Sequence, residues 1–143
     1  MIRLSVIIII MLAAVETIAQ KQGIEGKVVW IEGNQMPGPG NTREKPKGVS
    51  REIHVYEATH QQDVKQVNGF YTDVKSKLVA IAQTNANGEF CIKLPPGEYS
   101  VFTKEPEGLF ANLFDDQGRI NTISVEKRRF TPVTIEINYK AVF

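Results

Sequence analysis

The sequence predicts an all-β domain, a sandwich of about seven antiparallel strands, and three observations lead to this prediction. Short runs of β-branched and aromatic residues recur along the chain, separated by clusters of Gly, Pro and Asn. Several runs alternate apolar with polar residues, which is typical of a sheet with one buried and one solvated face. A helical period of apolar residues is hard to find anywhere after the first twenty residues.

The predicted strands follow one another along most of the chain. They cover residues 24–31, 51–58, 77–83, 90–94, 99–101, 110–114, 120–125 and 133–139, with the pattern weakest at 110–114 and 120–125. The last of them has one side that is entirely apolar or aromatic, which predicts that this side faces the core. Asn87-Gly88 predicts a hairpin turn, and Pro95-Pro96-Gly97 predicts that 90–94 and 99–101 form a second hairpin.

Two long connections interrupt the strands. Residues 34–49 hold three glycines and three prolines between positions 37 and 48, which argues against a regular element there. The polar stretch 59–76 carries Phe70-Tyr71 in its middle, and we expect no regular structure in it either. Structureless connections of this length are uncommon and often functional.

The first nineteen residues read as a cleaved signal peptide. Arg3 gives a positive start, residues 4–15 form an apolar run broken only by Ser5, and Thr17-Ile18-Ala19 offers small residues for cleavage after Ala19. A membrane anchor needs about 20 apolar residues, whereas this run meets Glu16 after twelve residues. We therefore expect an exported mature chain, residues 20–143, with one domain and no membrane span. The compartment is expected to be the periplasm, outer surface or medium of a Gram-negative bacterium.

Composition excludes several classes of function. The 17 Lys and Arg residues balance 16 Asp and Glu without a basic block, which argues against a nucleic-acid partner. Two His and a single Cys are too few for a disulfide framework or for most zinc sites. Cys91 has no histidine nearby in sequence, so we expect an inert thiol on the strand face opposite Phe90 and Ile92.

One stretch resembles a known family. The residues Gly88 and Phe90, then Leu94, Pro95, Gly97 and Tyr99, are similar to the core motif of carboxypeptidase regulatory-like domains. The opening Ile24-x-Gly26-x-Val28 and the closing Val133-x-Ile135-x-Ile137 resemble the first and last strands of that family. The resemblance implies a transthyretin-like (prealbumin-like), seven-stranded Greek-key sandwich and a non-catalytic module. The connections 34–49 and 59–76 depart from the family pattern, and the resemblance implies nothing about them.

We tested the chain for chemistry and found no convincing site, so we predict no enzyme activity, metal or cofactor. His54, His60 and Asp63 have the residue types for a metal site, but their spacing suits no standard one. The segment 115–118, Asp-Asp-Gln-Gly, hints at calcium, yet it is fully explained as a turn. A covalent bond between Lys27 and Asn138, as in some bacterial adhesin domains, would need a buried carboxylate that the sequence does not reveal.

Loops at the ends of a sandwich are its usual binding surfaces. The candidate contact residues are aromatic or polar and lie in the stretches 68–71 and 109–115: Phe70, Tyr71, Phe110, Asn112, Phe114 and Asp115. The competing interpretation is that these aromatic side chains pack long loops onto the core. The leading functional hypothesis is an envelope or surface module that binds an unidentified protein or assembles at the surface. The alternative is a module that binds a small ligand or a glycan.

Overall fold

The computed structural model describes residues 21–40 and 43–143. These residues form eleven strands and one 3₁₀ turn, with no α-helix among them, and the strands make two mainly antiparallel sheets. The all-β prediction is therefore confirmed. The predicted signal segment, residues 1–19, lies outside the described residues.

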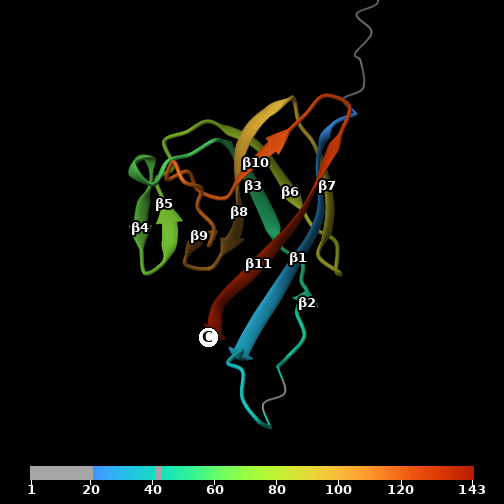
Figure 1. The fold of residues 1–143 in the computed structure, drawn as a ribbon. Coiled ribbons are helices and arrows are strands. Elements are labelled where there is room, and N and C mark those ends of the chain that lie inside the picture. Colours follow the sequence, from blue (N-terminus) through green and yellow to red (C-terminus); the bar gives the residue numbers. More distant parts are fainter. Residues whose placement is uncertain (1–20, 41–42) are drawn as a thin grey trace, which may run out of the picture.

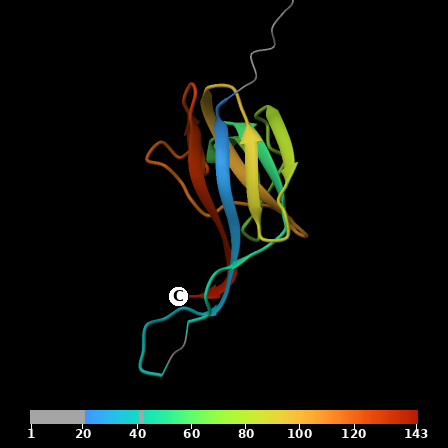
Figure 2. The same cartoon turned by 90° about the vertical axis from the view of Figure 1, so that its right-hand side faces the viewer.

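The two sheets form two layers, as Figures 1 and 2 show. The first sheet contains β1 (Gly23–Asn34), β2 (Lys47–Gly48), β7 (Glu89–Lys93) and β11 (Phe130–Val142). The second contains β3 (Glu52–Glu57), β4 (Lys65–Val67), β5 (Phe70–Thr72), β6 (Leu78–Gln83), β8 (Gly97–Glu105), β9 (Gly108–Phe110) and β10 (Thr122–Val125). Strands β2, β4 and β5 have only two or three residues, which is why the pattern of longer runs missed them. The strand predicted at 110–114 is wrong, because β9 ends at Phe110, whereas the one predicted at 120–125 contains β10.

Every strand of the first sheet pairs with β1. On one side β1 pairs with β11 in parallel, with Gly23 opposite Phe130 and Trp30 opposite Ile137. On the other side it pairs with β7 and β2 in antiparallel fashion. The prediction of a wholly antiparallel fold is therefore wrong for the first and last strands. Since the whole second sheet lies between them in sequence, the chain has ample length for the crossover that a parallel pair needs.

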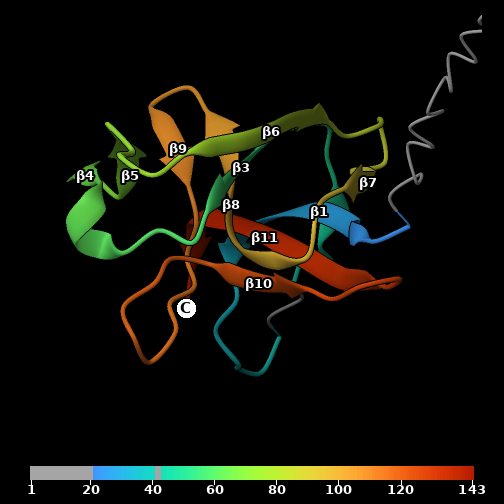
Figure 3. The same cartoon turned by 90° about the horizontal axis from the view of Figure 1, so that it is seen from above.

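Strand β8 is the centre of the second sheet. It pairs with β3 on one side and with β10 and β9 on the other, and β6 lies beyond β3. Strand β10 pairs only with β8, just as β11 pairs only with β1, so each leaves one edge open. Seen from above in Figure 3, β10 and β11 lie next to each other where the two layers meet.

The two predicted hairpins are crossings between the sheets. Strand β6 belongs to the second sheet, β7 to the first and β8 to the second, so neither turn joins two paired strands. Gly88 has φ +80°, and a Cβ there would lie 2.2 Å from the Val28 carbonyl oxygen, which explains the glycine. At the next crossing the Tyr99 hydroxyl donates a hydrogen bond to the Pro95 carbonyl oxygen. The alternating faces of β7 fit the first sheet as well as they fit a hairpin, so the sequence pattern alone did not separate the two arrangements.

One main core fills the space between the layers. Its buried members come from both sheets and include the motif residues Phe90, Leu94 and Tyr99 together with Ile24, Val28, Ile53, Val55, Val101, Ile135 and Ile137. Val133 and Tyr139 pack against the same core, which confirms the apolar side predicted for the last strand. Cys91 points the other way and is exposed, as the alternation predicts.

A second, smaller core lies on the outer face of the second sheet. It contains Tyr71, Phe102, Ala111 and Ile120, with Tyr56, Val64 and Leu109 packed around it. The predicted absence of structure in 59–76 is wrong, because this stretch contains a 3₁₀ turn, Gln61–Asp63, and the hairpin of β4 and β5. Likewise 34–49 contains β2. The hairpin forms because Phe70 reaches the main core while its neighbour Tyr71 reaches the smaller one.

A buried carboxylate joins the two sheets at one end of the core. The side chain of Glu105, on β8, is 0% exposed, and its two oxygens share the single N–H of Arg51 Nε, at 3.0 and 3.2 Å. It also accepts a hydrogen bond from the Tyr139 hydroxyl, on β11, at 2.9 Å. The Arg51 guanidinium in turn lies 5.5 Å from the centre of the Trp30 ring, on β1. Both sheets therefore contribute partners to one buried charge, which would be costly without them.

Removing the Glu105 carboxylate should lower the free energy of unfolding more than removing the hydroxyl of its partner Tyr139. We expect Glu105→Ala to lower the free energy of unfolding by about 3 kcal/mol, since a buried ion pair is broken. Tyr139→Phe should lower it by about 1 kcal/mol, the usual net value of one hydrogen bond. Urea denaturation of the two variants measures both values, and equal losses would contradict the central role of Glu105.

The same site predicts a loss of stability at alkaline pH. Burial, then the hydrogen bond and charge of Glu105, raise the pKa of Tyr139 from 10.0 to about 12. The folded chain therefore holds this proton more tightly than the unfolded chain, so the stabilisation is complete below pH 10 and disappears towards pH 12. In Tyr139→Phe the decline over this range should be shallower, though not absent, because burial also raises the pKa of Tyr56, Tyr71 and Tyr99. Urea midpoints measured from pH 9 to 12 test this, and identical curves would contradict it.

Candidate functional site

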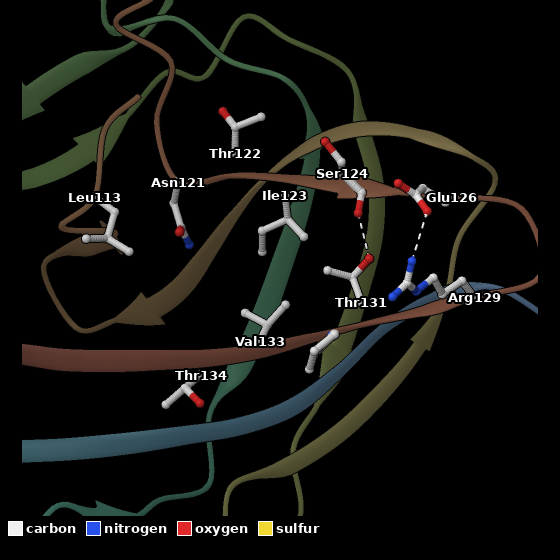
Figure 4. Close-up of a pocket in the computed structure, with 11 residues that line it drawn as sticks. Leu113, Asn121, Thr122, Ile123, Ser124, Glu126, Arg129, Thr131, Val133 and Thr134 are labelled. Carbon is white, nitrogen blue, oxygen red and sulfur yellow. Dashed lines mark hydrogen bonds and ion pairs between the residues drawn. The ribbon is translucent and has the colours of Figure 1, made fainter. Parts of the chain in front are cut away.

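The candidate site is a groove between the open edges of β10 and β11. It has a volume of about 560 Å³ and continues into a hollow of about 230 Å³ that shares Leu113, Asn121 and Thr134 with it. Figure 4 shows Ile123 and Val133 pointing toward one another across the gap, with Leu113 at one end. The floor is therefore apolar, and it lies where one sheet gives way to the other.

The β11 wall of the groove presents unpaired backbone. Gly23 N–H donates to the Arg129 carbonyl oxygen at 3.2 Å, and Gly23 stands opposite Phe130. In a parallel ladder the odd-numbered residues from 129 to 137 therefore turn their backbone groups toward β1, and the even-numbered ones turn theirs toward the groove. Pro132 fits this parity, because a residue without an N–H is tolerated on an open edge. Thr134 and Glu136 each offer an N–H and a C=O there.

The β10 wall of the groove also presents backbone groups that have no ladder partner. Val101 N–H donates to the Asn121 carbonyl oxygen at 3.3 Å, and Ile123 stands opposite Tyr99. In this antiparallel pair Thr122 and Ser124 therefore turn their backbone groups away from β8 and toward the groove. The groove is lined by backbone donors and acceptors on both sides and by aliphatic side chains between them.

Side-chain contacts close both ends of the groove. At one end Thr131 Oγ1 donates to the Ser124 carbonyl oxygen at 2.6 Å, next to the turn that joins β10 to β11. This turn carries Glu126, Lys127, Arg128 and Arg129, three cations against one anion, and Arg129 pairs with Glu126 at 3.4 Å. At the other end Asn112 Nδ2 donates to Asn138 Oδ1 at 2.9 Å. The open backbone between these closures runs from residue 132 to residue 136.

Half of the predicted contact residues lie in the cores. Phe70, Tyr71 and Phe110 are 7%, 2% and 6% exposed, so they hold the long connections to the body and are not free to contact a partner. Their rings pack with Phe102 or Tyr139. The competing interpretation of these aromatic residues as packing residues therefore describes them correctly.

The other three predicted residues lie in the loop beside the groove. Asn112 lines its continuation, and Phe114 is 49% exposed. Asp115 is occupied within its own turn, where Oδ1 accepts from Gln117 N–H and Arg119 N–H and Oδ2 accepts from Arg119 Nε. Although burial opposes the charge, these bonds lower the pKa of the Asp115 carboxyl below 3.8. The carboxylate therefore holds its own turn together.

The remaining chemical candidates do not assemble into a site. His54 Nε2 lies 2.8 Å from Glu52 Oε1, while His60 forms a β-bridge with Arg119. No three His, Cys, Asp or Glu side chains in the described ranges gather closely enough to hold a metal ion. Lys27 is exposed and stands opposite Thr134, four residues from Asn138 and so about 13 Å along the strand. The register therefore keeps the two candidates for a covalent bond apart.

A second hollow lies over the outer face of the second sheet. Its volume is about 410 Å³, and its lining includes His54, Tyr56, Tyr71, Lys104 and Glu107. Burial raises the pKa of Tyr56 and Tyr71, so both hydroxyls stay neutral. The hollow combines aromatic and charged side chains, and His54, which lies 2.8 Å from Glu52, is among them.

No family model, curated protein or solved structure matches the chain. In the part of the chain that the structure describes, no helix has the length and apolar character to cross a membrane.

Proline substitution tests which backbone groups face the groove. Thr134→Pro should leave the free energy of unfolding within about 1 kcal/mol of the parent, because the lost N–H has no ladder partner and Pro132 already fits this edge. Ile135→Pro should cost about 3 kcal/mol or more, because it removes a ladder bond to β1 and a buried side chain. Urea denaturation compares the two, and equal destabilisation would contradict the assigned parity.

Proposed function

We propose that this protein is an exported, non-catalytic β-sandwich module of the bacterial envelope that binds another protein. The groove between β10 and β11 supports the proposal best, since it combines an exposed aliphatic side chain, Leu113, with backbone groups that have no ladder partner. Beside it, Leu113 is 58% exposed and Phe114 is 49% exposed. An interface core typically holds such apolar residues within a polar rim, and Asn112, Asn121 and Thr134 supply that rim.

The finer description of the fold belongs to the same proposal. We infer a transthyretin-like Greek-key sandwich of the carboxypeptidase regulatory-like type, preceded by a cleaved signal peptide, residues 1–19. The two stacked sheets support it, as do the glycine turn at 88, the core positions of Phe90 and Leu94, and the Tyr99–Pro95 hydrogen bond. The parallel pairing of β1 with β11 and the hairpin of β4 and β5 are additions to the pattern that the resemblance implies.

A matched pair of exposed aliphatic residues tests the proposed binding surface. Leu113→Ser lies beside the groove, and Ile81→Ser lies on β6 at 52% exposure. Both should fold with the stability of the parent within about 0.5 kcal/mol. In the native host, a tagged chain should be exported, start near Gln20 by intact mass, and cross-link to a defined envelope protein. Leu113→Ser should reduce that cross-linking at least about fivefold, whereas Ile81→Ser should not change it.

Two results would count against the proposal. One is a full-length, unexported chain, and the other is equal cross-linking by both variants and the parent. The second candidate function is binding of a small ligand or glycan in the hollow lined by Tyr56 and Tyr71. It predicts a rise in melting temperature with glycans that Lys104→Ala abolishes, without any protein partner.

A further inference from the structure

We infer that the groove binds an extended peptide segment, which adds as a strand to the open edge of β11. This inference rests on the proposed function and names the kind of partner that the groove accepts. The occupant is an extended segment of another protein with aliphatic side chains at alternate positions and an acidic group near the turn 126–129.

The backbone of the groove specifies an extended occupant. Between residues 132 and 136 the β11 edge offers the C=O of Pro132 and both backbone groups of Thr134 and Glu136, by the parity derived above. Such a row of donors and acceptors is complementary to another strand and to few other ligands. Across the gap, Thr122 of β10 offers both of its backbone groups and Ser124 offers its N–H to the far side of the same segment, since the Ser124 carbonyl oxygen already accepts from Thr131.

The side chains of the groove favour an occupant with aliphatic residues at alternate positions. Successive residues of a strand point to opposite faces. A segment paired with β11 would therefore place every second side chain on the floor made by Ile123, Val133 and Leu113. Val133 and Ile123 already pack on the main core, so small or medium aliphatic side chains would extend that core outward. The intervening side chains would face water.

The ends of the groove set the length and the charge of the segment. The Thr131–Ser124 and Asn112–Asn138 hydrogen bonds bound the open stretch, so pairing covers about five residues of β11. Lys127, Arg128 and Arg129 outnumber Glu126 at the Thr131 end. An acidic group of the occupant is favoured there, and its contribution should weaken with salt because these side chains are exposed.

A second copy of the chain fits the groove less well. Two other strands with an open edge, β4 (Lys-Gln-Val) and β6 (Leu-Val-Ala-Ile-Ala-Gln), lack an acidic side chain to meet the basic turn. Strand β7 has Glu89, but its apolar side chains Phe90 and Ile92 are already buried in the main core and are not available to the groove. Two β11 edges brought together would place both basic turns and both Pro132 residues in the same interface. A heterologous segment with an acidic end avoids these conflicts.

Selection from a displayed library of random nine-residue peptides on the mature chain, residues 20–143, tests the inference. The selected peptides should have aliphatic residues at alternate positions and at least one Asp or Glu. Their affinity is then measured by fluorescence anisotropy with labelled synthetic copies. Thr134→Pro should weaken their binding at least about tenfold, because it removes a central donor and its ring obstructs the added strand. The matched control Thr134→Ala removes the side-chain hydroxyl but keeps the N–H, so it should weaken binding far less than Thr134→Pro does. Lys127→Glu should weaken binding about threefold at low salt.

Circular dichroism and urea denaturation first establish that the variants fold. No selected peptide, or peptides that bind Thr134→Pro as well as the parent, would overturn the inference. A concentration-dependent dimer that Thr134→Pro dissociates would also overturn it, because the occupant would then be a second copy. If no peptide binds the groove while the tagged chain still cross-links to an envelope protein through Leu113, this inference fails and the proposed function stands. If a peptide binds the groove but the chain is never exported, this inference stands and the proposed function as an exported module fails.

Discussion

The parallel pairing of β1 with β11 is the constraint on which the rest of the structure depends. All other strands of the first sheet pair with β1, and β11 carries its side of the main core through Ile135 and Ile137. The pairing requires glycine at position 26, where a Cβ would lie 1.6 Å from the Val133 carbonyl oxygen. Because β11 has β1 on one side only, the same pairing that builds the core also leaves the edge that lines the groove.

Glu105 shows how the two layers are held in register at the end of the core where its partner Arg51 also hydrogen-bonds Thr84, at the start of the turn that contains Gly88. Hydrophobic packing is non-directional, so aliphatic layers alone tolerate small displacements of one sheet over the other. A buried carboxylate with partners from β11 and from the segment before β3 allows far fewer arrangements. The edge-on packing of Trp30 and Tyr139, with ring centres 5.2 Å apart, adds an aromatic contact at the same place.

The sequence predicted the positions of most long strands and the buried face of the last one, because alternation and turn residues are local signals. It did not predict which strands pair, since β7 has the same alternating pattern whether it joins a hairpin or the other sheet. The aromatic residues Phe70 and Tyr71 indicated a functional loop, yet each packs into a different core. The groove left one readable trace in the sequence, Pro132 within a strand pattern, which is typical of an edge. The partners of Glu105 come from positions 51 and 139, a distance that no local pattern reveals.

The open edges of β10 and β11 explain what kind of binding this scaffold can support. Their backbone groups face the surface, where water satisfies them, so a new ladder exchanges hydrogen bonds with water for hydrogen bonds with protein. Each such bond gains only about 1 kcal/mol, and a ladder of about five residues is offset by the entropy of ordering a flexible segment. Affinity must therefore come mainly from apolar surface that is still exposed at the groove, above all Leu113, because Ile123 is already buried in the main core, and selectivity must come from the alternation and the basic turn. Within the open stretch 132–136, Pro132 and the exposed, charged Glu136 are the local barriers to unspecific pairing. Because Pro132 has no N–H to donate and the floor of the groove is apolar, this edge favours a short segment with aliphatic residues at alternate positions over a long strand of any sequence.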